Sequence, residues 1–186
     1  MASAITKLAT LTPSGSAVAT FSGISGSYDD LKIIGSAHSD YGSSDTWAYQ
    51  QMEIRFNGDS SSIYFSNILY AQGTAAGVGT VPHGTKSYTS GDRIYGGFAP
   101  NSVGTATQFS GFQMYIPGYA SAAYKGAQMS GGFNTSSYVT ASPRPFSCLE
   151  CCGWQSTAAI TSIGFTLDYG DYVAGTSMTL YGITNS

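Results

Sequence analysis

The sequence contains very little charge. Lysine, arginine, aspartate and glutamate make up only 9% of its 186 residues, whereas about 25% is usual for a globular protein. Charge keeps free proteins apart and discourages the edges of β-sheets from pairing with other chains. A surface this neutral predicts a protein that is held in an assembly. The alternative is a soluble β-domain with an unremarkable neutral surface.

Basic residues are few and dispersed. The net charge is −3 and the isoelectric point is about 5.0. Binding to a phosphate backbone needs clustered cations, so we expect no nucleic-acid partner. The seven basic residues are Lys7, Lys32, Arg55, Lys86, Arg93, Lys125 and Arg144.

Long apolar runs are absent as well. No run approaches the roughly 20 residues that a membrane-spanning helix needs, and residues 1–16 lack the charged-then-apolar order of a cleavable signal. We therefore expect no membrane partner and no export by a cleavable signal.

Cysteines are few and crowded. Cys148, Cys151 and Cys152 all lie in the segment SCLECCGW, which is not the spread-out framework of a disulfide-stapled secreted domain. Three thiolates could begin a zinc or iron site, but a tetrahedral site needs a fourth ligand. His38 and His83 are far away in the sequence and lack the spacing of a known metal motif. We expect free thiols, no metal and no cofactor.

Recognisable catalytic patterns are also lacking. His38 has Asp40 nearby, but no Gly-x-Ser-x-Gly elbow accompanies it. Most of the ten acidic residues lie in expected turns, and Asp168 and Asp171 lack the calcium-loop pattern. A polysaccharide-cleaving enzyme would depend on acids such as Asp168 or Glu53. We expect no enzymatic activity and name no catalytic residue.

The sequence does contain segments in which apolar and polar residues alternate with a period of two, which is typical of half-buried strands. The clearest example is 47–56, followed by Asn57 and Gly58, which predict a reversal and a returning strand at 63–71. Residues 160–183 predict a second pair of strands, either a hairpin or adjacent, that organises the sheet. No window shows helical periodicity.

The remaining segments complete an all-β pattern. Further strands are expected at 4–11, 16–21, 29–37, 93–99, 105–116 and 122–133. Long loops are expected at 72–91 and 134–155. The pattern predicts a single-domain, jelly-roll-like antiparallel β-sandwich over 17–186, preceded by an N-terminal arm or edge strand at 1–16. An immunoglobulin-like sandwich is the alternative, although its Cys-Trp-Cys spacing is absent.

Aromatic residues are abundant, with 14 tyrosines and 9 phenylalanines. Those in expected loops could stack on sugar rings, as aromatic side chains do in lectins. The alternative is that they belong to the core or to a subunit interface. The five candidates are Tyr41, Trp47, Tyr88, Tyr119 and Trp154.

Four segments occurring in order carry a family resemblance: YDDLKIIGSA, IRFNGDSSSIYFSNILY, YIPGYASAAYK and ITSIGFTLDYGDYVAGTSMTLYGI. Together they resemble tailed-bacteriophage virion proteins of jelly-roll type, which include capsid decoration (cement), head-fibre and tail-appendage proteins. The resemblance covers Leu8 to Ile183, and the sequence departs from the group at Cys148 to Trp154. It implies a non-enzymatic structural protein of the virion, made in the host bacterial cytoplasm and assembled as a homo-oligomer, with a trimer favoured.

Two functions follow as expectations from that resemblance. The first is a capsid cement protein that bridges subunits of the major capsid protein, or other virion proteins, through residues 1–16, 72–91 and 134–155. The alternative is a tail or head-fibre adhesin that binds host-surface glycan through loop aromatics. The absence of a repetitive or coiled-coil shaft favours the first.

Overall fold

The protein is built from β-strands. The computed structural model describes residues 4–42, 49–72, 83–102, 108–136 and 143–185, and within them it contains twelve strands and no helix. Accordingly, those residues include no helix that could cross a membrane. The strands are β1 (Ala4–Leu11), β2 (Val18–Phe21), β3 (Asp30–Ala37), β4 (Tyr49–Phe56), β5 (Tyr64–Gln72), β6 (His83–Gly91), β7 (Ile94–Pro100), β8 (Ser110–Pro117), β9 (Lys125–Ser136), β10 (Pro143–Trp154), β11 (Ile163–Leu167) and β12 (Ser177–Thr184).

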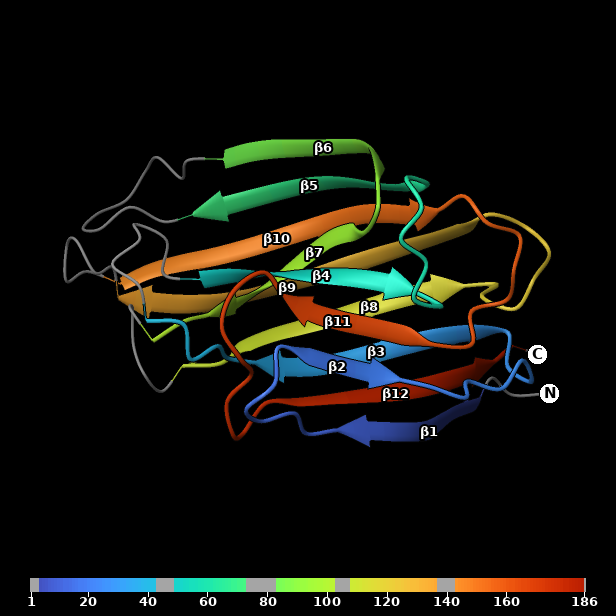
Figure 1. Ribbon diagram of the computed structural model, residues 1–186, viewed down its shortest axis with the longest axis horizontal. Helices are drawn as coiled ribbons and strands as arrows, with labels where there is room; N and C mark the ends of the chain where they lie inside the picture. The colour runs from blue at the N-terminus through green and yellow to red at the C-terminus, as the bar shows by residue number, and fades with distance from the viewer. Residues whose placement is uncertain (1–3, 43–48, 73–82, 103–107, 137–142, 186) are drawn as a thin grey trace.

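The strands form two antiparallel sheets that face each other (Figure 1). The larger sheet has the order β1-β12-β3-β8-β9-β10-β5-β6, and the smaller has the order β2-β11-β4-β7. Four pairs are nested along the chain: β1 with β12, β2 with β11, β3 with β8, and β4 with β7. One long antiparallel ribbon wrapped into two sheets gives this order, so the sandwich is of jelly-roll type and the all-β prediction is confirmed.

Two inserted hairpins make the larger sheet wider than the smaller one. Strands β5 and β6 are inserted between β4 and β7, and β9 and β10 between β8 and β11. All four strands join the same side of the larger sheet, beyond β8. Strand β7, at the edge of the smaller sheet, lies over β9, β10 and β5. The larger sheet therefore extends past the smaller one on this side.

The core lies between the sheets and follows the predicted alternation. On β4, Met52, Ile54 and Phe56 are completely buried, while the residues between them lie half-buried on the outer face. Strands β8 and β11 alternate in the same way. Each strand thus places one apolar face in a shared core, which is the main source of stability in a sandwich.

The two predicted strand pairs are present as strands but not as pairs. Strands β11 and β12 lie in different sheets, as do β4 and β5. The turn at Asn57 and Gly58 does form: both have positive φ, 54° and 66°, and the N–H of Asp59 donates to the carbonyl of Phe56 at 3.0 Å. The chain then crosses to the other sheet. The hairpin predictions were wrong because alternation reports which side is buried and not which strand is the neighbour.

The two predicted long loops were also partly wrong. Residues 83–91 form β6, an edge strand, and residues 143–154 form β10, which pairs with β9 along its whole length and with β5 from Phe146 to Trp154. Strand β10 alternates, but Cys148, Glu150 and Cys152 occupy buried positions where large apolar residues are usual. Residues 73–82 and 137–142 lie outside the described part of the chain.

The N-terminal segment takes the edge-strand role. Strand β1 forms one edge of the larger sheet and pairs with β12 from Ala4 opposite Thr184 to Leu11 opposite Met178. Leu8, Ala9 and Leu11 pack against the core. This segment therefore belongs to the sandwich itself.

Candidate functional site

The end of β5 and the starts of β4 and β10 lie at the same end of the sandwich (Figure 1). A pocket of about 250 Å³ is lined by residues of these strand ends. It exists because the larger sheet extends past β7, which leaves the inner faces of β5 and β10 only partly covered. We call it the end pocket. Its lining residues are Tyr41, Tyr49, Gln50, Gln51, Ile68, Tyr70, Phe98, Phe146, Asp168 and Tyr169.

The floor of the end pocket is an aromatic cluster centred on Phe146. The ring of Phe146 lies 4.7 Å from that of Phe98 and 5.1 Å from those of Tyr49 and Phe133, and it stacks on Tyr70 at 5.8 Å. These residues come from five strands, β4, β5, β7, β9 and β10. Aromatic contacts of this kind fix ring orientation and hold an apolar surface in place.

The rim of the end pocket combines two tyrosines with one carboxylate. The rings of Tyr41 and Tyr169 lie 5.4 Å apart, and Tyr169 is 61% exposed. Between sheet and rim, Oδ1 of Asp168 accepts hydrogen bonds from the backbone N–H groups of Gln51 at 3.1 Å and Tyr169 at 3.0 Å. Asp168 is on the surface, yet partial burial of its carboxyl group raises its pKa, and the charge of Glu53 adds to the rise.

The polar groups of the end pocket are not all satisfied. Nε2 of Gln51 is buried and has no hydrogen-bond partner among the described residues. Of the described residues that line the pocket, Asp168 is the one that carries a charge, and none of them is a lysine, arginine or histidine. The described residues of the pocket therefore offer aromatic surface, an unpaired amide donor and one negative charge.

The aromatic residues that the sequence offers as sugar-binding candidates lie in different places in the structure. Tyr41 lies at the pocket rim. Tyr119 and Trp154 follow the core alternative, because they are 0% and 2% exposed, and Trp154 lies in strand β10 and not in a loop. Trp47 and the side chain of Tyr88 lie outside the described part of the chain. Sequence reasoning missed the other aromatic residues of the pocket, because its members are brought together only by the inserted hairpins.

The cysteines and His38 do not form a chemical site. Cys148 and Cys152 are buried on the inner face of β10, Cys151 is exposed on the outer face, and all three are free. Burial raises the pKa of Cys148 to about 12, so its thiol stays protonated and unreactive near neutral pH. His38 is buried, and its Nδ1 lies 2.5 Å from the carbonyl oxygen of Gln108. Within the described ranges, no three metal-ligating residues cluster.

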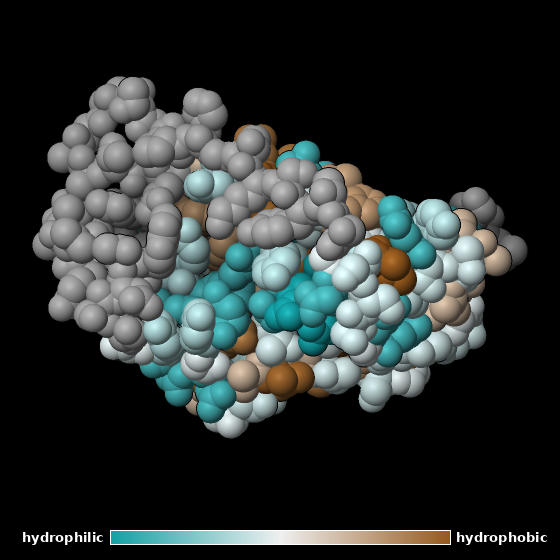
Figure 2. Space-filling view, turned by 45° about the horizontal axis from the view of Figure 1, so that its top comes forward, coloured by the Kyte–Doolittle hydropathy of each residue, from teal (hydrophilic) through white to brown (hydrophobic). Residues whose placement is uncertain are grey.

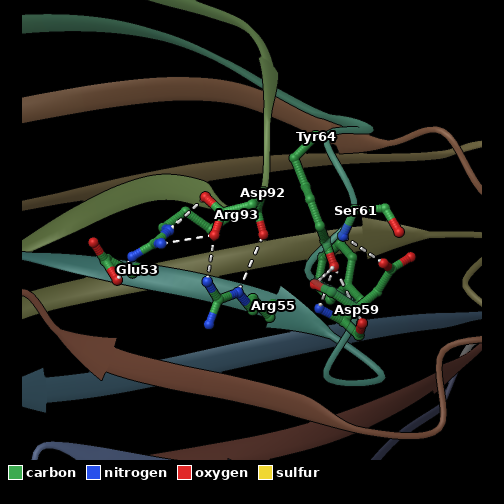
Figure 3. A network of polar contacts seen from close by, with 8 residues as sticks. Glu53, Arg55, Asp59, Ser61, Tyr64, Asp92 and Arg93 are labelled. Atoms are coloured by element: carbon green, nitrogen blue, oxygen red, sulfur yellow. Dashed lines mark hydrogen bonds and ion pairs between the residues drawn. The ribbon is translucent and has the colours of Figure 1, made fainter.

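A second polar group lies on the outer face of the smaller sheet (Figure 3). Asp92 accepts hydrogen bonds from Arg55 at 2.6 Å and Arg93 at 2.7 Å, and Arg93 also pairs with Glu53. Figure 2 views the molecule from the side of the smaller sheet and shows hydrophilic residues gathered near the middle. These ion pairs join Glu53 and Arg55 of β4 to Asp92 and Arg93, which directly precede β7. Glu53 is therefore paired with an arginine, and it is not among the residues that line the end pocket.

Replacing Asp92 with asparagine should lower the free energy of unfolding by about 1 kcal/mol, since these side chains are partly exposed and surface ion pairs are individually weak. The hydrogen bonds from Arg93 and Arg55 hold the pKa of Asp92 well below its ordinary value. This stabilisation is therefore present at neutral pH and lost as the pH falls toward that lowered pKa. Urea unfolding in low and high salt measures it, and the loss should shrink in 1 M salt.

Asp171→Asn is the matched control, because Asp171 forms no ion pair with the described residues. An Asp92→Asn loss that is the same at both salt concentrations would contradict an electrostatic origin.

Comparison of the chain with protein-family models, with curated proteins and with solved structures gave no match.

Proposed function

We propose that this chain is a non-enzymatic structural protein of a bacteriophage virion, most simply a capsid decoration protein. The observation that supports this most is the outer face of β8, β9, β10 and β5. Wherever the side chains of these four adjacent strands are described, the exposed outward ones are uncharged. We call this surface the neutral face; its outward residues include Gly111, Gln113, Tyr115, Gln128, Ser130, Ser147, Leu149, Cys151, Phe65, Asn67 and Leu69.

The neutral face also exposes apolar groups. Leu149 on β10 and Leu69 on β5 lie directly opposite each other and are 46% and 52% exposed. Phe65 lies on the same face of β5, two outward positions before Leu69 and opposite Gly153. A face of this kind can be buried against a partner without removing any charge from water, which is the main penalty of burying polar surface. Contact with a coat subunit would therefore be favourable by apolar burial alone.

The sheet edges offer a second means of contact. Strands β1 and β6 end the larger sheet, and β2 and β7 end the smaller one. The outer backbone groups of edge strands can pair with another chain. Edge pairing with further copies would give the homo-oligomer, with a trimer favoured, that we include in the proposal. Sedimentation analysis of the purified protein tests this part.

The copy number of the protein in phage particles tests the proposal directly. A decoration protein should be present in hundreds of copies and should be labelled by antibody over the whole shell in electron micrographs. Absence of the protein from purified particles would overturn the proposal.

A variant of the neutral face gives a sharper test. Leu149→Lys places one charge on this face at a half-exposed position, so the free energy of unfolding should change by less than about 0.5 kcal/mol. Rebinding to particles stripped of the protein should nevertheless weaken at least tenfold, because the charge must be buried in the contact.

Tyr124→Lys is the matched control for that variant, because Tyr124 is 68% exposed in the turn between β8 and β9 and does not belong to the neutral face. Equal rebinding of Leu149→Lys and the unmodified protein would show that another surface makes the contact.

A second candidate function is that of a tail or head-fibre adhesin for host glycan. The end pocket favours it, because an aromatic floor with amide and carboxylate groups at the rim suits a sugar ring. A count of only a few dozen copies per particle, with label at the tail or at fibre tips, would favour this function over decoration.

A further inference from the structure

We infer that the end pocket binds a single uncharged sugar ring, stacked against the rim tyrosines Tyr41 and Tyr169 and hydrogen-bonded by Gln51 and Asp168. This inference deepens the second candidate function and rests on it for its biological setting. The binding itself is a property of the isolated protein.

The size of the end pocket limits its ligand. Pockets that enclose a whole drug-sized molecule have volumes of about 300 to 1,000 Å³, whereas this one has about 250 Å³. It has room for one ring, with the remainder of an oligosaccharide outside. The exposed ring of Tyr169 lies at the rim, where such a chain would leave the pocket.

The polar groups select for hydroxyl groups. Nε2 of Gln51 is a buried donor without a partner, and leaving a buried donor unpaired is unfavourable. A ligand oxygen that accepts this hydrogen bond would remove that penalty. The carboxylate of Asp168 can only accept hydrogen bonds. A sugar hydroxyl satisfies both requirements because it is donor and acceptor at once.

Charge narrows the class further. The described lining residues include one carboxylate and no basic side chain, and this carboxylate disfavours an acidic sugar or a phosphate. A quaternary ammonium group could use the aromatic surface and Asp168. The ammonium group itself carries no acceptor and so cannot pair with Nε2 of Gln51. An uncharged sugar is the ligand that uses both groups.

Saturation-transfer NMR and calorimetric titration of the intact chain test this inference. The probes are the methyl glycosides of glucose, galactose, mannose, rhamnose and N-acetylglucosamine, with N-acetylneuraminic acid and choline as charged comparisons. At least one neutral glycoside should bind in the millimolar range. Tyr169→Ala should weaken that binding about tenfold, through loss of ring stacking.

Tyr124→Ala is the matched control, because Tyr124 is about as exposed as Tyr169 but directly precedes β9. The connection from β8 to β9 lies at the end of the sandwich opposite to the start of β10 (Figure 1). Tyr124→Ala should bind the glycoside as the unmodified protein does. Asp168→Asn keeps the Oδ1 that the backbone N–H groups of Gln51 and Tyr169 occupy but loses the charge and the Oδ2 acceptor, so binding of the neutral sugar should weaken severalfold without being lost.

Three results would overturn the inference: no binding of any neutral glycoside, equal losses in Tyr169→Ala and Tyr124→Ala, or choline binding that Asp168→Asn abolishes. These results are separate from those that test the virion role. A protein that coats phage shells but binds no sugar retains the decoration function and loses this inference.

Discussion

Replacing Glu150 with glutamine should abolish a large fall in stability that the unmodified protein shows between pH 5 and pH 8. Glu150 lies on the inner face of β10 and is 1% exposed. Neither carboxylate oxygen has a hydrogen-bond partner of ordinary geometry among the described residues. Gly96 is so close that an added Cβ would come within 2.7 Å of Oε2. The carboxyl group is therefore enclosed in the core, and no described basic side chain forms an ion pair with it.

Burial raises the pKa of Glu150 from the ordinary 4.5 to about 8, and Ser66 and Gly97 offset only part of the rise. The folded protein thus holds a proton that the unfolded chain releases above pH 4.5. Stability is highest below that value and decreases as the pH rises to about 8, where the folded protein also loses the proton. At about 1.36 kcal/mol per pKa unit, the decrease is roughly 4 to 5 kcal/mol.

Chemical unfolding at intervals between pH 5 and pH 8 measures this dependence. In Glu150→Gln the free energy of unfolding should be nearly constant over the range. Glu150→Met should be more stable than the unmodified protein at pH 8, because it buries no ionisable group. Glu53→Gln is the control: it changes the chain's other glutamate, which is paired with Arg93 on the outer face, and should leave the slope intact. An unchanged slope in Glu150→Gln would show that another group binds the proton.

Replacing Trp154 with alanine should destabilise the protein by about 3 to 5 kcal/mol, as is typical for a buried aromatic residue. Trp154 is 2% exposed at the end of β10. Its ring stacks on Tyr64 at 6.3 Å and meets Phe56 edge-on at 5.9 Å. Its Nε1–H donates to Oδ2 of Asp59 at 2.9 Å. The substitution would remove packing between the two sheets and also leave Asp59 without this donor.

Urea unfolding of three variants separates these contributions. Trp154→Phe keeps a ring but removes the donor, so its loss should be about half that of Trp154→Ala or less. Tyr124→Ala, at an exposed position, should change stability by less than about 0.5 kcal/mol. A loss below about 1 kcal/mol in Trp154→Ala would contradict the core role. Loss of sugar binding in Trp154→Ala would therefore report damage to the fold, whereas Tyr169→Ala changes the rim alone.

Much of the fold could be predicted because the burial of one face of a strand produces an alternation of apolar and polar residues in the sequence. Strands β4, β8 and β11 alternate cleanly, since each exposes one face to water and one to the core. The identity of the strand that pairs with each of them produces no comparable local pattern. In a jelly roll the nested strand pairs join segments that are distant along the chain. Local sequence patterns therefore reveal neither the crossing of the chain to the other sheet after Asn57 nor the crossing between β11 and β12.

The end pocket was harder to predict for a related reason. Its floor depends on Phe146 in β10. The sequence does not identify this strand, because cysteines and Glu150 occupy buried positions where large apolar residues are usual. Its rim depends on Tyr41 and Tyr169, which meet although 128 residues separate them. Of the five aromatic residues that the sequence offers as sugar-binding candidates, Tyr41 is the one found among the described lining residues of the pocket. The remaining members became visible once the position of the inserted hairpins was known.

The pairing of β1 with β12 has a consequence for how the protein is made. In the described part of the chain β12 is the sole partner of β1, and it leaves the ribosome about 170 residues later. During that delay β1 remains without its neighbour, and β3 lacks one of its two. Chains dominated by such distant pairings fold slowly, over milliseconds to seconds. We therefore expect the sandwich to close only after β12 has been synthesised, so that a nascent chain stalled before β12 remains open to proteases and chaperones.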